Sequence, residues 1–479
     1  MTDDDLCFTP ATRLAALVRR GKISPLELTR AVLDRIARVN PALNAYCTVA
    51  AEQALAAARA ATRALTRSAK LGPLHGIPVS IKDLTPTRGI RTTWGSKIFE
   101  DHVPDEDGLV VQRLKAAGAI VLGNTNTPEY GAGANTFNAV FGATRNPWNP
   151  ALTSGGSTGG GAVALATGMG PLAQGSDLGG SLRIPAAFCG VVGLRPSPGL
   201  VPVYPVATAW DSYSVQGPMA RTVGDLALML SVISGPDPRS PISYPVDGRT
   251  FTAATRRPTL RGARIAWSAD LGVTPVDDEI RRVAMSATGV LRGLGARVDE
   301  AHPDFTGLLD IVLASRGFSM VARHEDKLPK WREVMQENLV KNIEHGLGLS
   351  ASDVARAERL RTDLWERVRR FQQRYDFIVT PTTAVGPFPV ETIFPREING
   401  VPMQNYIQWV LLTYAFTVVG LPAISVPCGF TRKGLPVGLQ IVGRWRDDAS
   451  VLRAAAAFES AAPWADRRPP DPPARSPRA

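Results

Sequence analysis

Apolar and polar residues near the start of the chain follow the spacing of an amphipathic helix. In ISPLELTRAVLDRI the apolar residues recur every three or four positions, which places them on one helical face. Ser24 is placed to cap this helix, with Pro25 at its first position and Glu27 completing a capping box. The Ala-rich run AEQALAAARAATRAL, from residue 51, also favours helix. The pattern therefore predicts a helical N-terminal lead-in over residues 1–70.

Farther along the chain, short apolar runs bounded by turn residues predict strands. They are GIPVSI (76–81), AIVLG (119–123), MGPLAQG (169–175), RIAW (264–267), ARVDE (296–300), FIVTPTT (377–383) and AISVPCGF (423–430). A helical run separates RIAW from ARVDE, and residues 303–375 are mostly amphipathic helix. Because strands and helices interleave without a clear linker or an internal repeat, we predict an α/β fold. It is one large domain over residues 71–462, with a mixed β-sheet core surrounded by α-helices.

Composition narrows the classes of partner and cofactor. Hydrophobic residues make up 44% of the chain and charged residues 20%, which is typical of a globular protein with a large core. The formal net charge is +11, but the basic residues are scattered, so we expect no nucleic-acid partner. No CxxC pair or His cluster has metal-ligand spacing, so we expect no metal, no other cofactor and no disulfide framework. The four cysteines are predicted to be reduced: Cys7, Cys47, Cys189 and Cys428.

The start of the chain and its apolar runs indicate where in the cell the protein is expected, and its end predicts a tail. The start, MTDDDLCFTPATRLAALVRRG, is acidic and lacks the pattern of a secretory signal. No apolar run reaches the roughly eighteen residues that a membrane span needs. We therefore expect a cytoplasmic protein that has no membrane partner. The end, residues 463–479, is rich in Pro and Arg and predicts a disordered tail. No coiled-coil heptad run is present, and a homodimer is left open as one oligomeric state.

The stretch GSDLGGSLRIP, residues 175–185, places two glycines directly before Ser181. Backbone N–H groups stabilise an oxyanion only where they converge and nothing bulky covers them. Gly179 and Gly180 would allow such an approach while the hydroxyl of Ser181 attacks a carbonyl carbon. The alternative is an ordinary glycine-rich turn, which these residues alone favour.

A nucleophilic serine needs a base to take its proton. The five histidines lie in no recognised catalytic motif, so lysine is the other candidate. Lys82 ends the apolar strand GIPVSIKD, where burial would lower its pKa. The alternative is a strand-end lysine turned to water.

A glycine-rich loop, SGGSTGGGAVALATG (154–168), precedes a predicted helix. It is not a P-loop, because Ala162 follows the last glycine where a P-loop has Lys. A dinucleotide fingerprint, and a G-x-S-x-G motif with Ser157 as nucleophile, both require a preceding apolar strand. The preceding NPWNPALTS is instead rich in proline. Neither motif is supported.

Together, GIPVSIKD, TSGGSTGGGAVALATG and GSDLGGSLRIPAAFCGVVGLRPS resemble the amidase signature family of serine hydrolases. LGNTNTPEYG, GATRNPWNP, GLPAISVPCGF and GLPVGLQIVG add to the resemblance, which covers about residues 10 to 460. It implies a Ser, cis-Ser, Lys core within residues 76–200 and a variable substrate-side region at about 303–400. Ser181 would be the acyl-accepting nucleophile. Ser157, after a cis peptide bond, would relay protons, and Lys82 would be the neutral base.

The resemblance also implies supporting groups around Ser181. The backbone of Leu178, Gly179, Gly180 and Ser181 would form the oxyanion hole. Asp177 and Arg183 would support that loop as an ion pair, the alternative being that each is separately solvated. Thr158 stands where many members have a second serine, and we take it as a supporting residue.

The family includes free-standing amidases and the glutaminase subunit of tRNA-dependent amidotransferases. For that glutaminase we would expect SDTGGSIRQPA and an acidic residue shortly before GLPA. This chain has Ile184 in place of that glutamine and no Asp or Glu between Glu397 and Asp447. The segment before GLPA reads NYIQWVLLTYAFTVV, and it favours an apolar acyl or amine group if it faces the pocket.

The resemblance thus implies an amidase that hydrolyses C–N bonds of apolar aryl or alkyl amides through an acyl-enzyme on Ser181. Esters would be easier substrates, carbamates are a further alternative, and the glutaminase of a tRNA-dependent amidotransferase is the alternative function. The expected partner is a small-molecule amide, ester or carbamate. Candidate substrate contacts are Tyr130, Tyr204, Trp210 and Trp409, together with the helices of residues 303–375.

Overall fold

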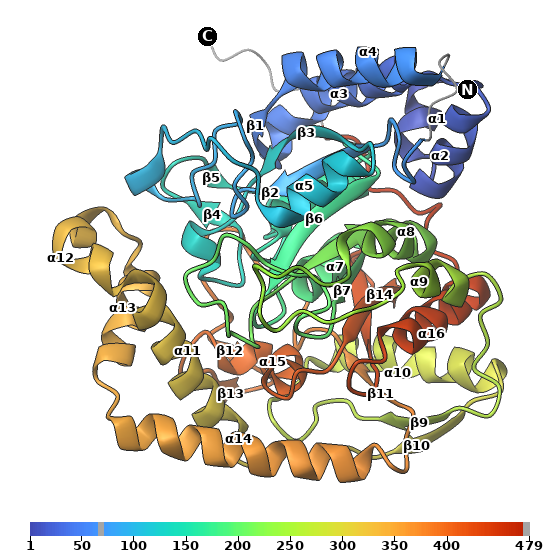
Figure 1. Cartoon of the computed structure of the whole chain (residues 1–479). Coiled ribbons are helices and arrows are strands. Elements are labelled where there is room, and N and C mark those ends of the chain that lie inside the picture. The colour runs from blue at the N-terminus through green and yellow to red at the C-terminus, as the bar shows by residue number, and fades with distance from the viewer. Residues whose placement is uncertain (66–70, 473–479) are drawn as a thin grey trace.

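A mixed β-sheet runs through the whole molecule (Figure 1). The computed structural model describes residues 1–65 and 71–472. Within them the main sheet has 11 strands, in the order β1 (Tyr46–Val49), β3 (Ile120–Thr125), β2 (Pro78–Lys82), β6 (Leu172–Asp177), β8 (Val215–Ala220), β7 (Val192–Arg195), β14 (Ala423–Phe430), β15 (Pro436–Val442), β11 (Phe377–Pro381), β9 (Arg264–Trp267) and β10 (Arg297–Glu300). β2 pairs in parallel with β3 and β6, and β9 with β10 and β11, whereas the other pairs are antiparallel. The prediction of an α/β fold with a mixed sheet is confirmed.

Helices surround this sheet, and three of them are buried along their whole length. The buried ones are α6 (Gly159–Ala166), α7 (Arg183–Cys189) and α15 (Leu411–Val418). The others are α1 (Asp3–Phe8), α2 (Ala11–Arg19), α3 (Pro25–Leu43), α4 (Ala51–Leu65), α5 (Leu109–Ala116), α8 (Val223–Ile233), α9 (Arg249–Ala254), α10 (Asp278–Gly293), α11 (Leu308–His324), α12 (Leu328–Trp331), α13 (Glu337–Leu347), α14 (Ala351–Phe371) and α16 (Asp448–Ala461). No helix in the described ranges combines the length and apolar character that crossing a membrane requires.

The N-terminal lead-in is more than a helical extension. The capping box of α3 forms as predicted, with Ser24 accepting from Glu27 and Glu27 accepting from Ser24. Between α3 and α4, however, β1 pairs antiparallel with β3 at one edge of the main sheet. Residues 1–65 therefore share the sheet and core of the rest of the chain.

The C-terminal segment also differs from its prediction. Residues 463–472 have no helix or strand, yet they contact the domain. The Trp464 side chain is buried and donates to the backbone oxygen of Arg221. Asp471 forms an ion pair with Arg35. This part of the predicted disordered tail is thus held in place, while residues 473–479 lie outside the described residues.

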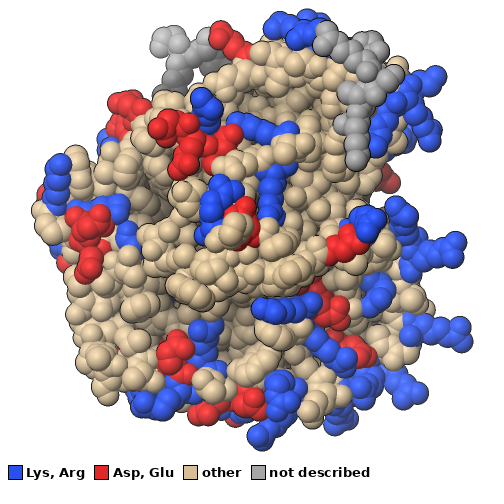
Figure 2. Space-filling model, in the orientation of Figure 1, with Lys and Arg blue, Asp and Glu red and all other residues tan. Residues whose placement is uncertain are grey.

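Charged side chains form no single basic patch on the face in Figure 2. Lys and Arg lie along the rim and in the upper centre of that face, with Asp and Glu among them. On this face, the basic residues are therefore not gathered into one binding surface.

Two neighbouring parallel strands determine where the chemistry lies. β2 and β6 are adjacent and run in the same direction, so their carboxyl ends meet at one edge of the sheet. Lys82 is the last residue of β2, and Asp177 is the last of β6. The chain leaves β6 through residues 178–182, here called the Ser181 loop, and enters α7. Ligand sites of α/β sheets lie at this kind of edge.

The glycine-rich segment brings α6 against the same edge. A Cβ on Gly160 would lie 2.5 Å from the backbone nitrogen of Asn126 and from the backbone oxygen of Ala45. Only glycine permits that approach. The run of glycines in SGGSTGGGAVALATG is thus a packing requirement that places Ser157 and Thr158, directly before α6, beside β2 and β6.

Candidate active site

Lys82 lies at the centre of a hydroxyl cluster and is fully buried. Its Nζ is 2.7 Å from Ser157 Oγ, 3.0 Å from Thr158 Oγ1 and 3.0 Å from Ser176 Oγ. Burial lowers the pKa of the Lys82 ammonium from its usual 10.5 to about 7, against a smaller opposing effect of the Asp177 charge. A lysine in this state has a substantial neutral fraction near neutral pH. The alternative of a strand-end lysine turned to water is wrong.

Ser157 occupies the position expected of a proton relay. The peptide bond between Gly156 and Ser157 is cis, as the family resemblance implies. Ser157 Oγ accepts from Lys82 and lines the same cavity as Ser181. Thr158 accepts a second bond from Lys82 and donates to the backbone oxygen of Ser176 at 3.3 Å. Thr158 therefore holds the lysine in place, in line with a supporting role.

Asp177 holds the Ser181 loop through hydrogen bonds from the backbone of the loop. Its carboxylate accepts from the amides of Gly180 and Leu182 at 2.9 and 3.1 Å. Gly180 has a φ of +119°, in a region that residues with a Cβ rarely adopt. The amides of Leu178, Gly179 and Ser181 have no hydrogen-bond acceptor among the described residues. Three amides of the predicted oxyanion hole are thus available to a ligand, whereas that of Gly180 is already used.

Asp177 and Arg183 form a buried ion pair, and the alternative that each is separately solvated is wrong. Two nitrogens of Arg183 contact the two carboxylate oxygens at 2.8 and 3.0 Å, and neither side chain is exposed. Arg195 approaches the same carboxylate at 3.4 Å. Burial alone would raise the pKa of Asp177, but Arg183 and Arg195 outweigh it and hold the pKa below its ordinary value. The carboxylate stays charged under the Ser181 loop.

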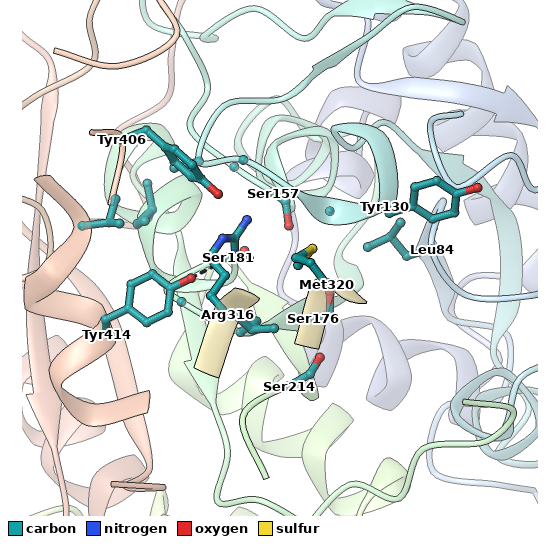
Figure 3. Close-up of a pocket in the computed structure, with 18 of the residues that line it drawn as sticks. Leu84, Tyr130, Ser157, Ser176, Ser181, Ser214, Arg316, Met320, Tyr406 and Tyr414 are labelled. Carbon is teal, nitrogen blue, oxygen red and sulfur yellow. Dashed lines mark hydrogen bonds between the residues drawn. The ribbon is translucent and has the colours of Figure 1, made fainter. Parts of the chain in front are cut away.

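A cavity opens above these groups (Figure 3). The empty space between its walls is about 620 Å³, which includes open solvent. Its wall combines the catalytic candidates with side chains from distant segments: Leu84, Tyr130, Ser157, Ser176, Leu178, Gly179, Ser181, Ile184, Ser214, Arg316, Met320, Arg323, Tyr406, Val410 and Tyr414. Ser181 is half-buried there, and its hydroxyl makes no hydrogen bond within the described residues.

The predicted substrate contacts are distributed unevenly. Tyr130 lines this cavity, whereas Tyr204 lines a second hollow that shares Leu84, Tyr130, Ser176, Ser214 and Arg323 with the first. Trp210 is 78% exposed and borders a separate surface groove. Trp409 is fully buried, and its ring packs against those of Phe188 and Phe388. Trp409 is therefore a core residue and not a substrate contact, because its indole packs into this aromatic cluster.

Several residues of the cavity were not singled out from the sequence. Ser176 lies in the stretch that identifies Ser181, and its hydroxyl could have been noted there. Arg316 lies on α11, in the region expected to vary, and nothing in its local sequence marks it. Tyr406 and Tyr414 belong to NYIQWVLLTYAFTVV, so that segment does face the cavity, but with tyrosines as well as aliphatic groups.

Comparison with known proteins identifies the family of this chain. The family model described as Amidase matches residues 27–452. The acylamidase of Rhodococcus erythropolis is 40% identical over 474 residues, which cover 98% of this chain and 99% of that protein. A glutamyl-tRNA(Gln) amidotransferase subunit of Thermosynechococcus vestitus is 36% identical, and the match covers 95% of this chain and 98% of that one. A solved bacterial aryl acylamidase aligns with a TM-score of 0.88 at 33% identity, covering 95% of this chain and 97% of that one.

A buried lysine among hydroxyls, at the edge of this large mixed sheet, is the arrangement of a hydrolase site. The chain belongs to the amidase signature family, whose members act on the C–N bonds of amides.

Proposed function

We propose that this protein is a free-standing amidase that cleaves aryl or alkyl amides of small acids through an acyl-enzyme on Ser181. The observation that carries the proposal is the contact of 2.7 Å between the fully buried Lys82 and Ser157, in a cavity that also exposes Ser181. A neutral lysine accepts a proton that the hydroxyl of Ser157 relays.

In the first half-reaction, Ser181 Oγ bonds to the carbonyl carbon as its proton passes to Ser157 and the Ser157 proton passes to Lys82. The carbonyl oxygen becomes an oxyanion, and the unused amides of Leu178, Gly179 and Ser181 stabilise it. The C–N bond then breaks as Ser157 protonates the departing nitrogen and Lys82 returns a proton to Ser157. An amine leaves, and the acyl group stays on Ser181.

In the second half-reaction, water attacks the acyl carbon and passes its proton through Ser157 to Lys82. The Ser181 ester bond breaks, Ser181 Oγ recovers a proton along the same relay, and the acid is released. Esters fit the same route because an alcohol needs less help to leave than an amine. Carbamates fit it with a carbamoyl group on Ser181.

The second candidate function is the glutaminase of a tRNA-dependent amidotransferase, which the 36% identity to an amidotransferase subunit favours. Against it, no Asp or Glu lines the cavity among the described residues, so no carboxylate is in place to hold the amino group of glutamine. The free-standing amidase is the better supported of the two.

The test measures amine release from acetanilide, a matching aryl carbamate and glutamine, with the wild type and Ser181→Ala. We expect aniline release from an apolar substrate by the wild type and a loss of about ten-thousand-fold in the variant. Ammonia from glutamine alone would instead support the amidotransferase glutaminase. Equal aniline release by both proteins would overturn the role of Ser181.

A further inference from the structure

One charged group in the cavity is not used by the hydrolytic mechanism. Arg316 of α11 exposes only 7% of its surface. Its Nε donates to Asn342 Oδ1 at 2.8 Å, and its Nη1 donates to the Tyr414 hydroxyl at 3.0 Å. Its Nη2 is buried without a hydrogen-bond partner in the part of the chain that the structure describes. A buried charged donor without an acceptor is costly, and Arg316 belongs to the wall of a cavity that a ligand can enter.

The charge of Arg316 is also unbalanced. The other cation on the cavity wall, Arg323, forms an ion pair with Asp211. Arg316 has no carboxylate within ion-pair distance in residues 1–65 and 71–472, and its guanidinium lies 5.3 Å from the centre of the Tyr406 ring. Since no Asp or Glu lines the cavity in those residues either, the anion that would complete this site has to come from a ligand.

Tyr414 gives the site a second donor. Its hydroxyl accepts from Arg316 and has no other partner among the described residues, so its own proton is free to donate. Arg316 and Tyr414 both line the cavity and contact each other, so the guanidinium and the hydroxyl are neighbouring donor groups on one wall. A carboxylate has two oxygens that can accept both.

The position of these donors indicates which end of the substrate they meet. The Tyr414 ring lies against the Ser181 loop, so closely that a Cβ on Gly179 would be 2.2 Å from Tyr414 Cζ. In Figure 3, Tyr406 and Tyr414 lie on one side of Ser157, Leu84 and Tyr130 lie on the other, and the Arg316 side chain is drawn over Ser181, toward Tyr414.

The second hollow opens from the side of Leu84 and Tyr130, and Trp94, Phe99 and Tyr204 line it. Ser176, which contacts Lys82, belongs to both hollows. The leaving nitrogen has to be within reach of the proton relay, so an aryl or alkyl amine fits the second hollow. The acyl chain then extends toward Arg316.

We propose that the acyl part of the substrate carries a carboxylate, as in the half-amide of a small dicarboxylic acid, and that Arg316 and Tyr414 bind it. This inference rests on the proposed amidase function. It names the acyl group of that reaction and makes Arg316 a specificity-determining residue.

The test compares two anilides that share the same leaving group. Succinanilic acid ends in a carboxylate, and 4-methylpentananilide has a neutral isopropyl group of the same shape. The wild type is expected to show a kcat/KM about 30-fold higher for succinanilic acid, as a buried charge-assisted contact allows. Arg316→Gln should remove most of that ratio, and Arg316→Lys should keep part of it.

Arg323→Gln is the matched control, because it makes the same change on the same helix and the same cavity wall. Its charge is already paired, so the ratio between the two anilides should stay near the wild-type value. A second control places the carboxylate on the amine side: the ratio of 4-acetamidobenzoate to acetanilide should not depend on Arg316. Thermal unfolding of each variant separates a loss of specificity from a loss of fold.

The proposal is overturned if the wild type cleaves the neutral anilide as well as succinanilic acid, a result that needs no variant. It is also overturned if Arg316→Gln and Arg323→Gln change the ratio equally. Failure of the amidase function would look different, because the wild type would then release no aniline from either anilide.

Discussion

The two sides of the cavity are built in opposite ways. On the sheet side, Lys82 contacts three hydroxyls, and Asp177 pairs with two arginines and accepts from two amides. On the helical side, Arg316 has no carboxylate within ion-pair distance among the described residues. This contrast indicates that the catalytic groups are preorganised before substrate arrives, while the wall that selects the acyl group is completed by the substrate itself.

Removing the base from the sheet side should give the largest effect. Lys82→Ala should lower amide hydrolysis by about ten-thousand-fold. The loss on the matching phenyl ester should be much smaller, because only the amide strictly needs a proton returned to its leaving group. The measurement is kcat/KM for acetanilide and phenyl acetate with both proteins. Equal losses on the two substrates would contradict the relay.

Removing the charge that fastens the Ser181 loop should affect the fold itself. Asp177→Ala leaves Arg183 and Arg195 buried without their carboxylate, so the free energy of unfolding should fall by about 3 to 5 kcal/mol. Denaturant unfolding measures this change. Asp278→Ala is the matched control, because Asp278 pairs with Arg281 on the exposed surface, and it should cost much less. Similar losses in the two variants would refute the buried anchor.

The contact between the two sides can be tested at Gly179. Gly179→Ala puts a Cβ 2.2 Å from the ring of Tyr414, so the Ser181 loop or Tyr414 has to shift. A displacement of this kind near reacting atoms costs on the order of 100-fold in kcat/KM. Gly289→Ala is the control, since nothing lies within 4 Å of the added Cβ on α10. Unaltered activity of Gly179→Ala toward acetanilide would show that the two sides are not in contact.

The smallest effect is expected from pH. Lys82 acts as a base only when neutral, and burial places the pKa of its ammonium at about 7. The kcat/KM for acetanilide, which does not ionise, should fall about tenfold per unit as pH drops below 7 and level off above it. Because Asp177 stays charged, it adds no inflection in that range. A profile that is flat between about pH 5.5 and 8.5 would contradict a titrating Lys82.

The sequence predicted the sheet side better than the helical side, and contact distance along the chain explains why. Ser176, Asp177, Ser181 and Arg183 lie within one short stretch, so a local motif carries their relationship. Arg316 meets Asn342 and Tyr414, which are 26 and 98 residues away. A local sequence pattern cannot predict contacts between residues that are so far apart in the chain. Trp409 was misplaced for a related reason, since which residues of a mostly apolar segment face a cavity depends on packing against distant residues such as Phe188.

Strands with a strong local pattern were predicted, and strands without one were not. RIAW and AISVPCGF match β9 and β14 because their apolar runs are continuous. β8 was not predicted, since VQGPMA contains Gly and Pro and shows no alternation. β1 was not predicted either, because YCTV lies between two strong helical patterns and joins the sheet only by pairing with β3.

The hydrogen-bond partners of Arg183 lie far along the chain, which affects when the active site can be completed during synthesis. Arg183 donates to the backbone oxygen of Thr413 and to Gln440, which are 230 and 257 residues farther along the chain. A ribosome that has made β2, β6 and the Ser181 loop has therefore made every proposed catalytic residue, yet not the groups that lock them. We therefore expect the nascent chain to stay inactive until residue 440 has left the exit tunnel and these contacts can form.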